Sequence, residues 1–174
     1  MNLPNKLTMT RIIMVPIFMA LMLCEQYVWA LVVFALASIT DFLDGYLARK
    51  YNLVSSFGKI MDPLADKLLT FGALVCFIQL EVVSVWAPII IIAREFFVTS
   101  MRVVAVSKGK VIAASWWGKI KTNVQLFAII FSMLLCAFGN TELAAILIWI
   151  SALFTVASWI AYIFENISVF KDEE

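Results

Sequence analysis

The sequence of 174 residues contains no histidine, and charged residues make up only 14% of it. The absence of histidine excludes every mechanism that needs an imidazole as base, nucleophile or metal ligand, including histidine-dependent phospholipase D and acid phosphatase chemistry. Thirteen basic and twelve acidic residues give a net charge of +1, so no overall field favours nucleic acid as a partner. Any functional information must therefore lie in where the few charges are placed.

Cysteine is also scarce. Cys24, Cys76 and Cys136 stand far apart in apolar sequence, with neither the spacing of a zinc site nor the even number of a disulfide framework. We interpret them as packing residues. The sequence has no internal repeat, no low-complexity tract and no linker long enough to separate domains, which predicts a single domain over residues 1–174.

Hydrophobic residues, by contrast, make up 64% of the chain and give it a mean hydropathy of +0.99, which places it in a lipid bilayer. About 20 residues of helix cross the hydrocarbon core, and a helix satisfies its own backbone polar groups there. The sequence therefore predicts an all-α, polytopic bundle of six transmembrane helices with a short N-terminal juxtamembrane segment. The six apolar runs cover residues 9–25, 27–48, 61–80, 85–106, 119–138 and 142–164.

We expect the first run to be retained as a membrane span rather than cleaved as a signal peptide. No small residue precedes Cys24, and no Ala-x-Ala cleavage site follows it.

The charges at the ends of these runs are segregated by sign. The links after the first, third and fifth runs contain no lysine or arginine and carry Glu25, Glu81 and Glu142. Cations gather at the opposite ends, which the positive-inside rule assigns to the cytoplasm. We therefore expect a multi-pass protein of the bacterial inner membrane with both termini in the cytoplasm. The cations are Lys6, Arg11, Arg49, Lys50, Lys59, Lys108, Lys110, Lys119, Lys121 and Lys171.

Four aspartates lie where the second run ends and the third begins. Asp41 and Asp44 are three residues apart, and Asp62 and Asp66 are four apart, so each pair projects from one face of its helix. A carboxylate facing lipid costs about 3 kcal/mol, so such residues are usually functional. Hard oxygen ligands suit Mg²⁺ or Mn²⁺, and four carboxylates suit two ions. The sequence predicts a site for two divalent cations, whereas an acidic solvated loop is disfavoured because the intervening residues 50–57 are basic and polar.

Written together, the aspartates belong to a longer motif. It reads Asp41-x-x-Asp44-Gly45-x-x-Ala48-Arg49, eight residues, Gly58, three residues, Asp62, three residues and Asp66. The motif resembles the signature of the CDP-alcohol phosphatidyltransferases at every specified position, and the six runs cover nearly the whole chain in the manner of that family. The resemblance implies an enzyme that transfers a phosphatidyl group from CDP-diacylglycerol to a small alcohol, uses two divalent cations and forms a homodimer.

The resemblance also implies a role for each residue of the motif. Asp41 and Asp62 would bridge the two metal ions, and Asp44 would bind one of them. Asp66 would serve both as a ligand and as the general base. Considered alone, the small residues also fit tight helix packing, and the N-terminal residues also fit helix capping or lipid headgroup contact. The residues implied in binding CDP are Gly45, Ala48, Arg49 and Gly58, together with Asn5, Thr8, Thr10 and Arg11.

The fourth run and the loop after it hold more cations than orientation requires. Arg94 is the most informative, because an arginine in apolar sequence is costly unless it faces a polar cavity or a partner such as Glu95. This stretch resembles the branch of the family that uses glycerol 3-phosphate as acceptor. For the loop lysines, orientation and attraction to anionic lipid are the alternative explanation. The residues expected to bind the acceptor phosphate are Arg94, Arg102, Ser115, Lys119 and Lys121.

Three other functions stay open. The same chemistry could use another acceptor, either phosphatidylglycerol, as in a cardiolipin synthase, or inositol phosphate. A cation transporter also holds carboxylates in a helical bundle, but its site lies near the midplane and often within repeats. A non-catalytic membrane scaffold is the third alternative. The position of the aspartates at one edge of the bundle, without a repeat, favours the enzyme.

Overall fold

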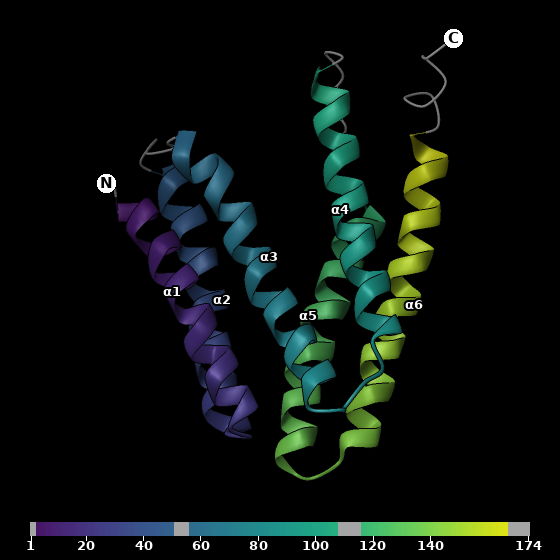
Figure 1. The fold of residues 1–174 in the computed structure, drawn as a ribbon. Helices are drawn as coiled ribbons and strands as arrows, with labels where there is room; N and C mark the ends of the chain where they lie inside the picture. The colour runs from purple at the N-terminus through teal and green to yellow at the C-terminus, as the bar shows by residue number, and fades with distance from the viewer. Residues whose placement is uncertain (1–2, 51–55, 108–115, 167–174) are drawn as a thin grey trace.

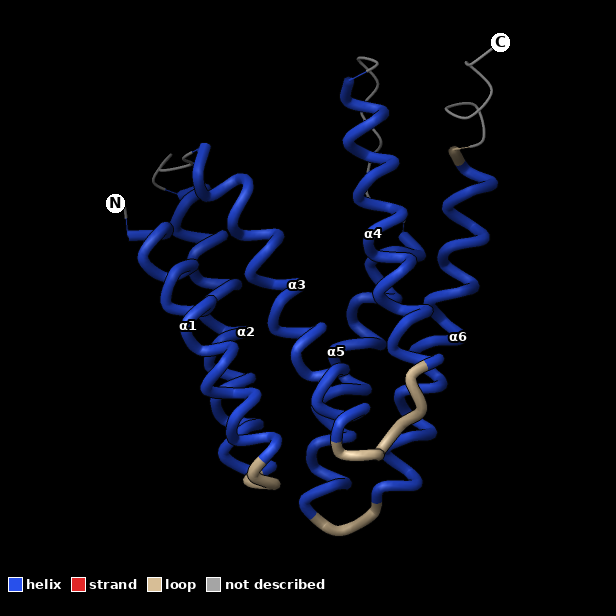
Figure 2. Tube along the Cα trace, in the orientation of Figure 1, coloured by secondary structure: helices blue, strands red, loops and turns tan. Residues whose placement is uncertain are grey.

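The computed structural model describes residues 3–50, 56–107 and 116–166, and within them it leaves out the side chains of residues 3–6, 41–50, 56–60, 62, 63 and 66. Helices joined by short loops make up the described chain, in which no strand occurs (Figures 1 and 2). This confirms the predicted all-α fold of six helices. They are α1 (Leu3–Leu23), α2 (Tyr27–Lys50), α3 (Ser56–Gln79), α4 (Trp86–Ser107), α5 (Trp116–Ala137) and α6 (Thr141–Glu165).

The turns after α1, α3 and α5 lie at one end of the bundle (Figure 2) and share a hydrogen-bond pattern. At the end of α5, the backbone N–H groups of Gly139 and Asn140 donate to the carbonyls of Cys136 and Leu135, at 3.0 and 2.8 Å. Gly139 has a φ of 75°, as the cap of a Schellman motif requires. The turns after α1 and α3 repeat the pattern with a glutamate at a φ of 58° and 57°.

The helices pack in two groups. Helices α1, α2 and α3 form one group, α4, α5 and α6 form the other, and α2 and α5 make the main contact between them. Helix α1 packs against both α2 and α3, α6 packs against α4 and α5, and α2 contacts α5 (Figure 1). The rings of Phe18 and Phe34, both fully buried, lie 5.5 Å apart between α1 and α2. A Cβ atom on Gly72 of α3 would lie 3.3 Å from the sulfur of Met19 on α1. The small residue thus lets these two helices approach closely.

The outer surface is apolar and part of the interior is charged. Phe127 and Leu153 are 58% and 66% exposed, whereas Arg94 and Lys121 are 5% and 2% exposed. In a soluble protein, large apolar residues are mostly buried, and arginine and lysine are mostly exposed. The distribution is therefore that of a protein whose surface faces lipid.

Among the described residues, α5 and α6 are each long and apolar enough to cross a membrane. Two such helices are consistent with a membrane protein. The apolar stretches that the structure describes in α1, α2 and α3 are shorter. The shorter stretches are Leu7–Leu23 in α1, Tyr27–Thr40 in α2 and Lys67–Gln79 in α3.

Helices α1, α3 and α5 begin at the end of the bundle opposite the three turns, and α2, α4 and α6 end there (Figure 1). The aspartate motif occupies the end of α2 and the beginning of α3, and the loop cations flank α4 and α5. The fold therefore brings the motif and the cations to the same end of the molecule.

Candidate functional site

The four motif aspartates lie on two helices that contact each other. Asp41 and Asp44 belong to the last three turns of α2, and Asp62 and Asp66 to the first three turns of α3. Each pair is thus about one helical turn apart on a regular helix. The side chains of these aspartates lie outside those that the structure describes, so the predicted metal cage stays a prediction.

The residues predicted to bind CDP are distributed over the same two helices and α1. Thr8 and Arg11 are fully buried on α1, while Thr10 is exposed. A buried guanidinium is stable only among polar or anionic partners. Because α1 packs on both aspartate-bearing helices, its position fits a role at that end of the bundle. The predicted residues whose side chains lie outside the description are Asn5, Gly45, Ala48, Arg49 and Gly58.

A cavity of about 670 Å³ lies between α3, α4 and α5. Its size suits a small ligand. Four cationic side chains and one carboxylate line it, so the lining carries a positive charge. Three of the five residues predicted to bind the acceptor phosphate are among them, and a fourth, Ser115, lies outside the described residues. The charged lining residues are Lys67, Arg94, Arg102, Lys119 and Glu95, and the others are Val98, Thr99, Gly118, Thr122 and Asn123.

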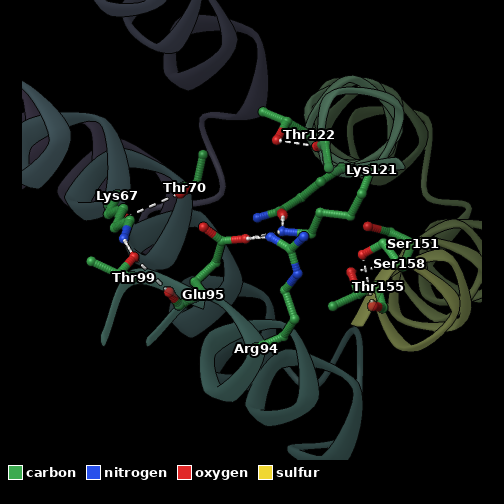
Figure 3. Close-up of polar contacts among 12 residues, drawn as sticks. Lys67, Thr70, Arg94, Glu95, Thr99, Lys121, Thr122, Ser151, Thr155 and Ser158 are labelled. Atoms are coloured by element: carbon green, nitrogen blue, oxygen red, sulfur yellow. Dashed lines mark hydrogen bonds and ion pairs between the residues drawn. The ribbon is translucent and has the colours of Figure 1, made fainter. Parts of the chain in front are cut away.

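A buried ion-pair network forms one side of this cavity (Figure 3). Oε1 of Glu95 accepts hydrogen bonds from Nη1 of Arg94 at 2.9 Å and from Nζ of Lys121 at 2.6 Å. The Lys121 ammonium also donates to the side-chain oxygen of Gln125. Arg94 thus both lines a polar cavity and pairs with Glu95, and its binding of the acceptor phosphate stays a prediction. The pairing offsets the cost of holding these charges away from water.

Lys121, the fifth residue predicted to bind the acceptor phosphate, lines a smaller cavity of about 220 Å³. Its side chain is 2% exposed, and its ammonium is bound to Glu95 and Gln125. The structure therefore places this charge in the wall behind the larger cavity. The other residues that line the smaller cavity are Ser38, Lys67, Thr70, Glu95, Thr122, Gln125 and Leu126.

Helix α6 adds hydroxyl groups to the same polar interior. Figure 3 shows Ser151, Thr155 and Ser158 on the side of Arg94 and Lys121 away from α3. All three are at most 1% exposed. Thr155 and Ser158 donate to backbone carbonyls of their own helix at 2.8 and 2.9 Å. Polar side chains therefore surround the network from α4, α5 and α6.

Lys67 and Thr99 are among the lining residues that the sequence-based prediction did not include. Lys67 lines both cavities, and its ammonium donates to Oγ1 of Thr99. Thr99 in turn donates to the backbone carbonyl of Glu95 at 2.7 Å. Lys67 could have been found by the argument that identified Arg94, because it is a cation directly after Asp66 in an apolar run. Thr99 carries no such signal.

Comparison with known proteins gives the family of this chain. The chain matches the family model described as CDP-alcohol phosphatidyltransferase over residues 1–157. The CDP-diacylglycerol–glycerol-3-phosphate 3-phosphatidyltransferase of Bacillus subtilis is 40% identical over 98% of this chain and 97% of its own length. Proteins of the same name from Rickettsia typhi and Haemophilus influenzae are each 37% identical, over 92% and 93% of this chain and 94% and 91% of their own lengths. This chain belongs to the CDP-alcohol phosphatidyltransferase family.

Proposed function

We propose that this membrane enzyme transfers the phosphatidyl group of CDP-diacylglycerol to glycerol 3-phosphate, which gives phosphatidylglycerophosphate and CMP. The cationic cavity between α3, α4 and α5 carries the proposal, because four cations against one carboxylate form a receptor for a doubly charged phosphate. An acceptor without phosphate, such as serine, would leave this charge unused. Relatives from three bacteria are named for the same acceptor.

The four aspartates would hold two divalent cations, Mg²⁺ or Mn²⁺. The donor set fits these ions, since it consists of hard carboxylate oxygens on two contacting helices and the chain has no histidine. Bound there, the ions would neutralise the pyrophosphate and stabilise the charge on the departing CMP. The residues concerned are Asp41, Asp44, Asp62 and Asp66.

Asp66 would be the general base of the reaction. It would take the proton from the acceptor hydroxyl as that oxygen attacks the phosphorus that carries diacylglycerol. The bond from this phosphorus to the oxygen of the CMP phosphate breaks as the new bond forms, and CMP leaves. Lys67 is the next residue of α3 and lines the cationic cavity, so the backbone of Asp66 lies at the edge of the acceptor site.

The CDP portion of the donor would lie over the ends of α1, α2 and α3 beside the aspartates. Glycines leave the backbone open to a close ligand, and an arginine can bind a phosphate. The packing of α1 on both α2 and α3 supports this placement. The residues proposed to bind CDP are Gly45, Ala48, Arg49, Gly58, Asn5, Thr8, Thr10 and Arg11.

We propose that the whole chain forms one domain that crosses a bacterial inner membrane six times, with both termini and the site at the cytoplasmic face. The sign of the charges supports this orientation, since Arg102 and Lys119 lie at the end with the site and Glu25 and Glu81 at the other. Membership of the family also favours a homodimer.

A panel of acceptors tests the proposed reaction. Purified protein with CDP-diacylglycerol and Mg²⁺ receives glycerol 3-phosphate, phosphatidylglycerol, inositol phosphate or serine, and CMP release is measured. We expect release to be fastest with glycerol 3-phosphate. Faster release with phosphatidylglycerol or inositol phosphate would replace the acceptor, and cation flux in liposomes without CMP release would identify a transporter.

A further inference from the structure

Lys67 occupies the junction of the two polar cavities. It is half-buried on α3, one residue after Asp66, and it lines both the cavity of about 670 Å³ and that of about 220 Å³. Figure 3 shows its side chain extending toward α4, where it meets Thr99. The ammonium therefore faces the acceptor cavity from the helix that carries the proposed base.

The partner of Lys67 is a neutral group. Its ammonium donates to Oγ1 of Thr99, whose own hydrogen is used in the 2.7 Å bond to the backbone carbonyl of Glu95. This arrangement orients the lysine but does not neutralise it. An ammonium has three donors, and among the described side chains Thr99 alone accepts from this one. Two donors stay available for a ligand in the cavity.

Two other cations beside the cavities, Arg94 and Lys121, already have a carboxylate partner. Lys121 is bound by Glu95 and Gln125, and Arg94 is paired with Glu95 at 2.9 Å. The one carboxylate among the described lining residues, Glu95, offsets part of their combined charge. Lys67 has no such offset from a described carboxylate. Arg102 and Lys119 line the larger cavity without a described carboxylate partner as well, and of these three cations Lys67 alone lies beside Asp66 on α3. An anion in the cavity would gain from each of them.

We propose that Lys67 is an acceptor-binding residue whose ammonium binds the phosphate of the incoming glycerol 3-phosphate. The inference rests on the proposed function, which supplies the acceptor. Because Lys67 adjoins Asp66 on one rigid helix, holding the phosphate at Lys67 fixes how far the acceptor hydroxyl lies from the base. Lys67 thereby selects for acceptors that carry a phosphate at the right distance from the attacking hydroxyl.

The test compares Lys67→Gln and Lys67→Arg with the wild-type enzyme, as full chains purified in mixed detergent and lipid micelles with Mg²⁺. We expect Lys67→Gln to raise the KM for glycerol 3-phosphate about 10- to 100-fold, the loss of one charge-assisted hydrogen bond. The KM for CDP-diacylglycerol should stay the same. Lys67→Arg keeps the charge and should recover part of the affinity. Gln79→Met, at the exposed far end of the same helix, is the matched control and should leave both constants unchanged.

The outcomes separate this inference from the proposed function. An unchanged KM for glycerol 3-phosphate in a folded Lys67→Gln enzyme would overturn the assignment, and so would a rise confined to CDP-diacylglycerol. If Lys67→Gln does not fold, the inference depends on Lys67→Arg, which must then show a raised KM for glycerol 3-phosphate alone. A wild-type enzyme that releases no CMP with glycerol 3-phosphate would instead refute the proposed function.

Discussion

Glu95 holds together the buried charges beside the acceptor cavity. One of its oxygens accepts from both Arg94 and Lys121, which are 6% and 2% exposed in their side chains. Glu95→Gln removes the negative charge and leaves two buried cations side by side. We expect the free energy of unfolding in mixed micelles to fall by about 1–3 kcal/mol, because a buried charged group loses its ionic partner.

The exposed Glu165 near the end of α6 provides the control, since Glu165→Gln should change the stability by less than about 0.5 kcal/mol. A double-mutant cycle with Lys121→Met isolates the pair. The second substitution should cost less when the first is present. Additive losses would show that Glu95 and Lys121 do not stabilise each other.

Asp66 is the residue whose loss should affect the chemistry and little else. Asp66→Asn keeps the size of the side chain but cannot take a proton from the acceptor hydroxyl. We expect kcat to fall by at least about 100-fold, the usual contribution of a general base. Size-exclusion profile and thermal stability should match those of the wild type. Full turnover by the folded variant would exclude Asp66 as the base.

For individual residues, the sequence predicts which charged side chains lie in apolar surroundings better than it predicts which residues they contact. Arg94 stands out because it interrupts an apolar run, and its neighbour Glu95 is an evident partner. The bond from Lys121 to Glu95 spans 26 residues, and that from Lys67 to Thr99 spans 32. Such contacts depend on which faces of α3, α4 and α5 meet, and apolar sequence that is alike on all sides of a helix does not specify this.

Among the helices and turns, the turn after α5 allows a direct test of whether its left-handed residue must be glycine. Gly139 has a φ of 75°, and a Cβ atom there would meet no atom within 4 Å. Gly139→Ala therefore adds backbone strain without a clash. We expect it to lower the free energy of unfolding by about 1 kcal/mol. Gly139→Asn should cost less, because asparagine tolerates the left-handed conformation. Equal losses for the two variants would contradict this explanation.

The number of helices follows from hydropathy, because an apolar run of this length must satisfy its backbone within itself. Their ends do not follow as closely. Helices α1 and α3 begin at Leu3 and Ser56, several residues before the predicted runs that start at residues 9 and 61. Polar residues can continue a helix beyond the hydrocarbon core, where hydropathy falls although the backbone hydrogen bonds persist.

The proposed orientation of the whole molecule in the membrane rests on the placement of its charges, with cations at the end that holds the site and glutamates at the other. Six crossings with both termini in the cytoplasm predict that a fluorescent protein fused to the C-terminus will be fluorescent in bacterial cells. Alkaline phosphatase fused at the same position should be inactive, because it folds only in the periplasm. Active phosphatase would mean an odd number of crossings or the opposite orientation.

The requirement for divalent cations tests the central claim most directly, since four carboxylates in apolar helices are explained by the ions they would hold. The measurement is CMP release from CDP-diacylglycerol and glycerol 3-phosphate by the purified protein, first with a chelator and then with added Mg²⁺ or Mn²⁺. We predict no release with the chelator and full recovery when either ion is restored. Release that continues at the same rate in the presence of the chelator would contradict the account.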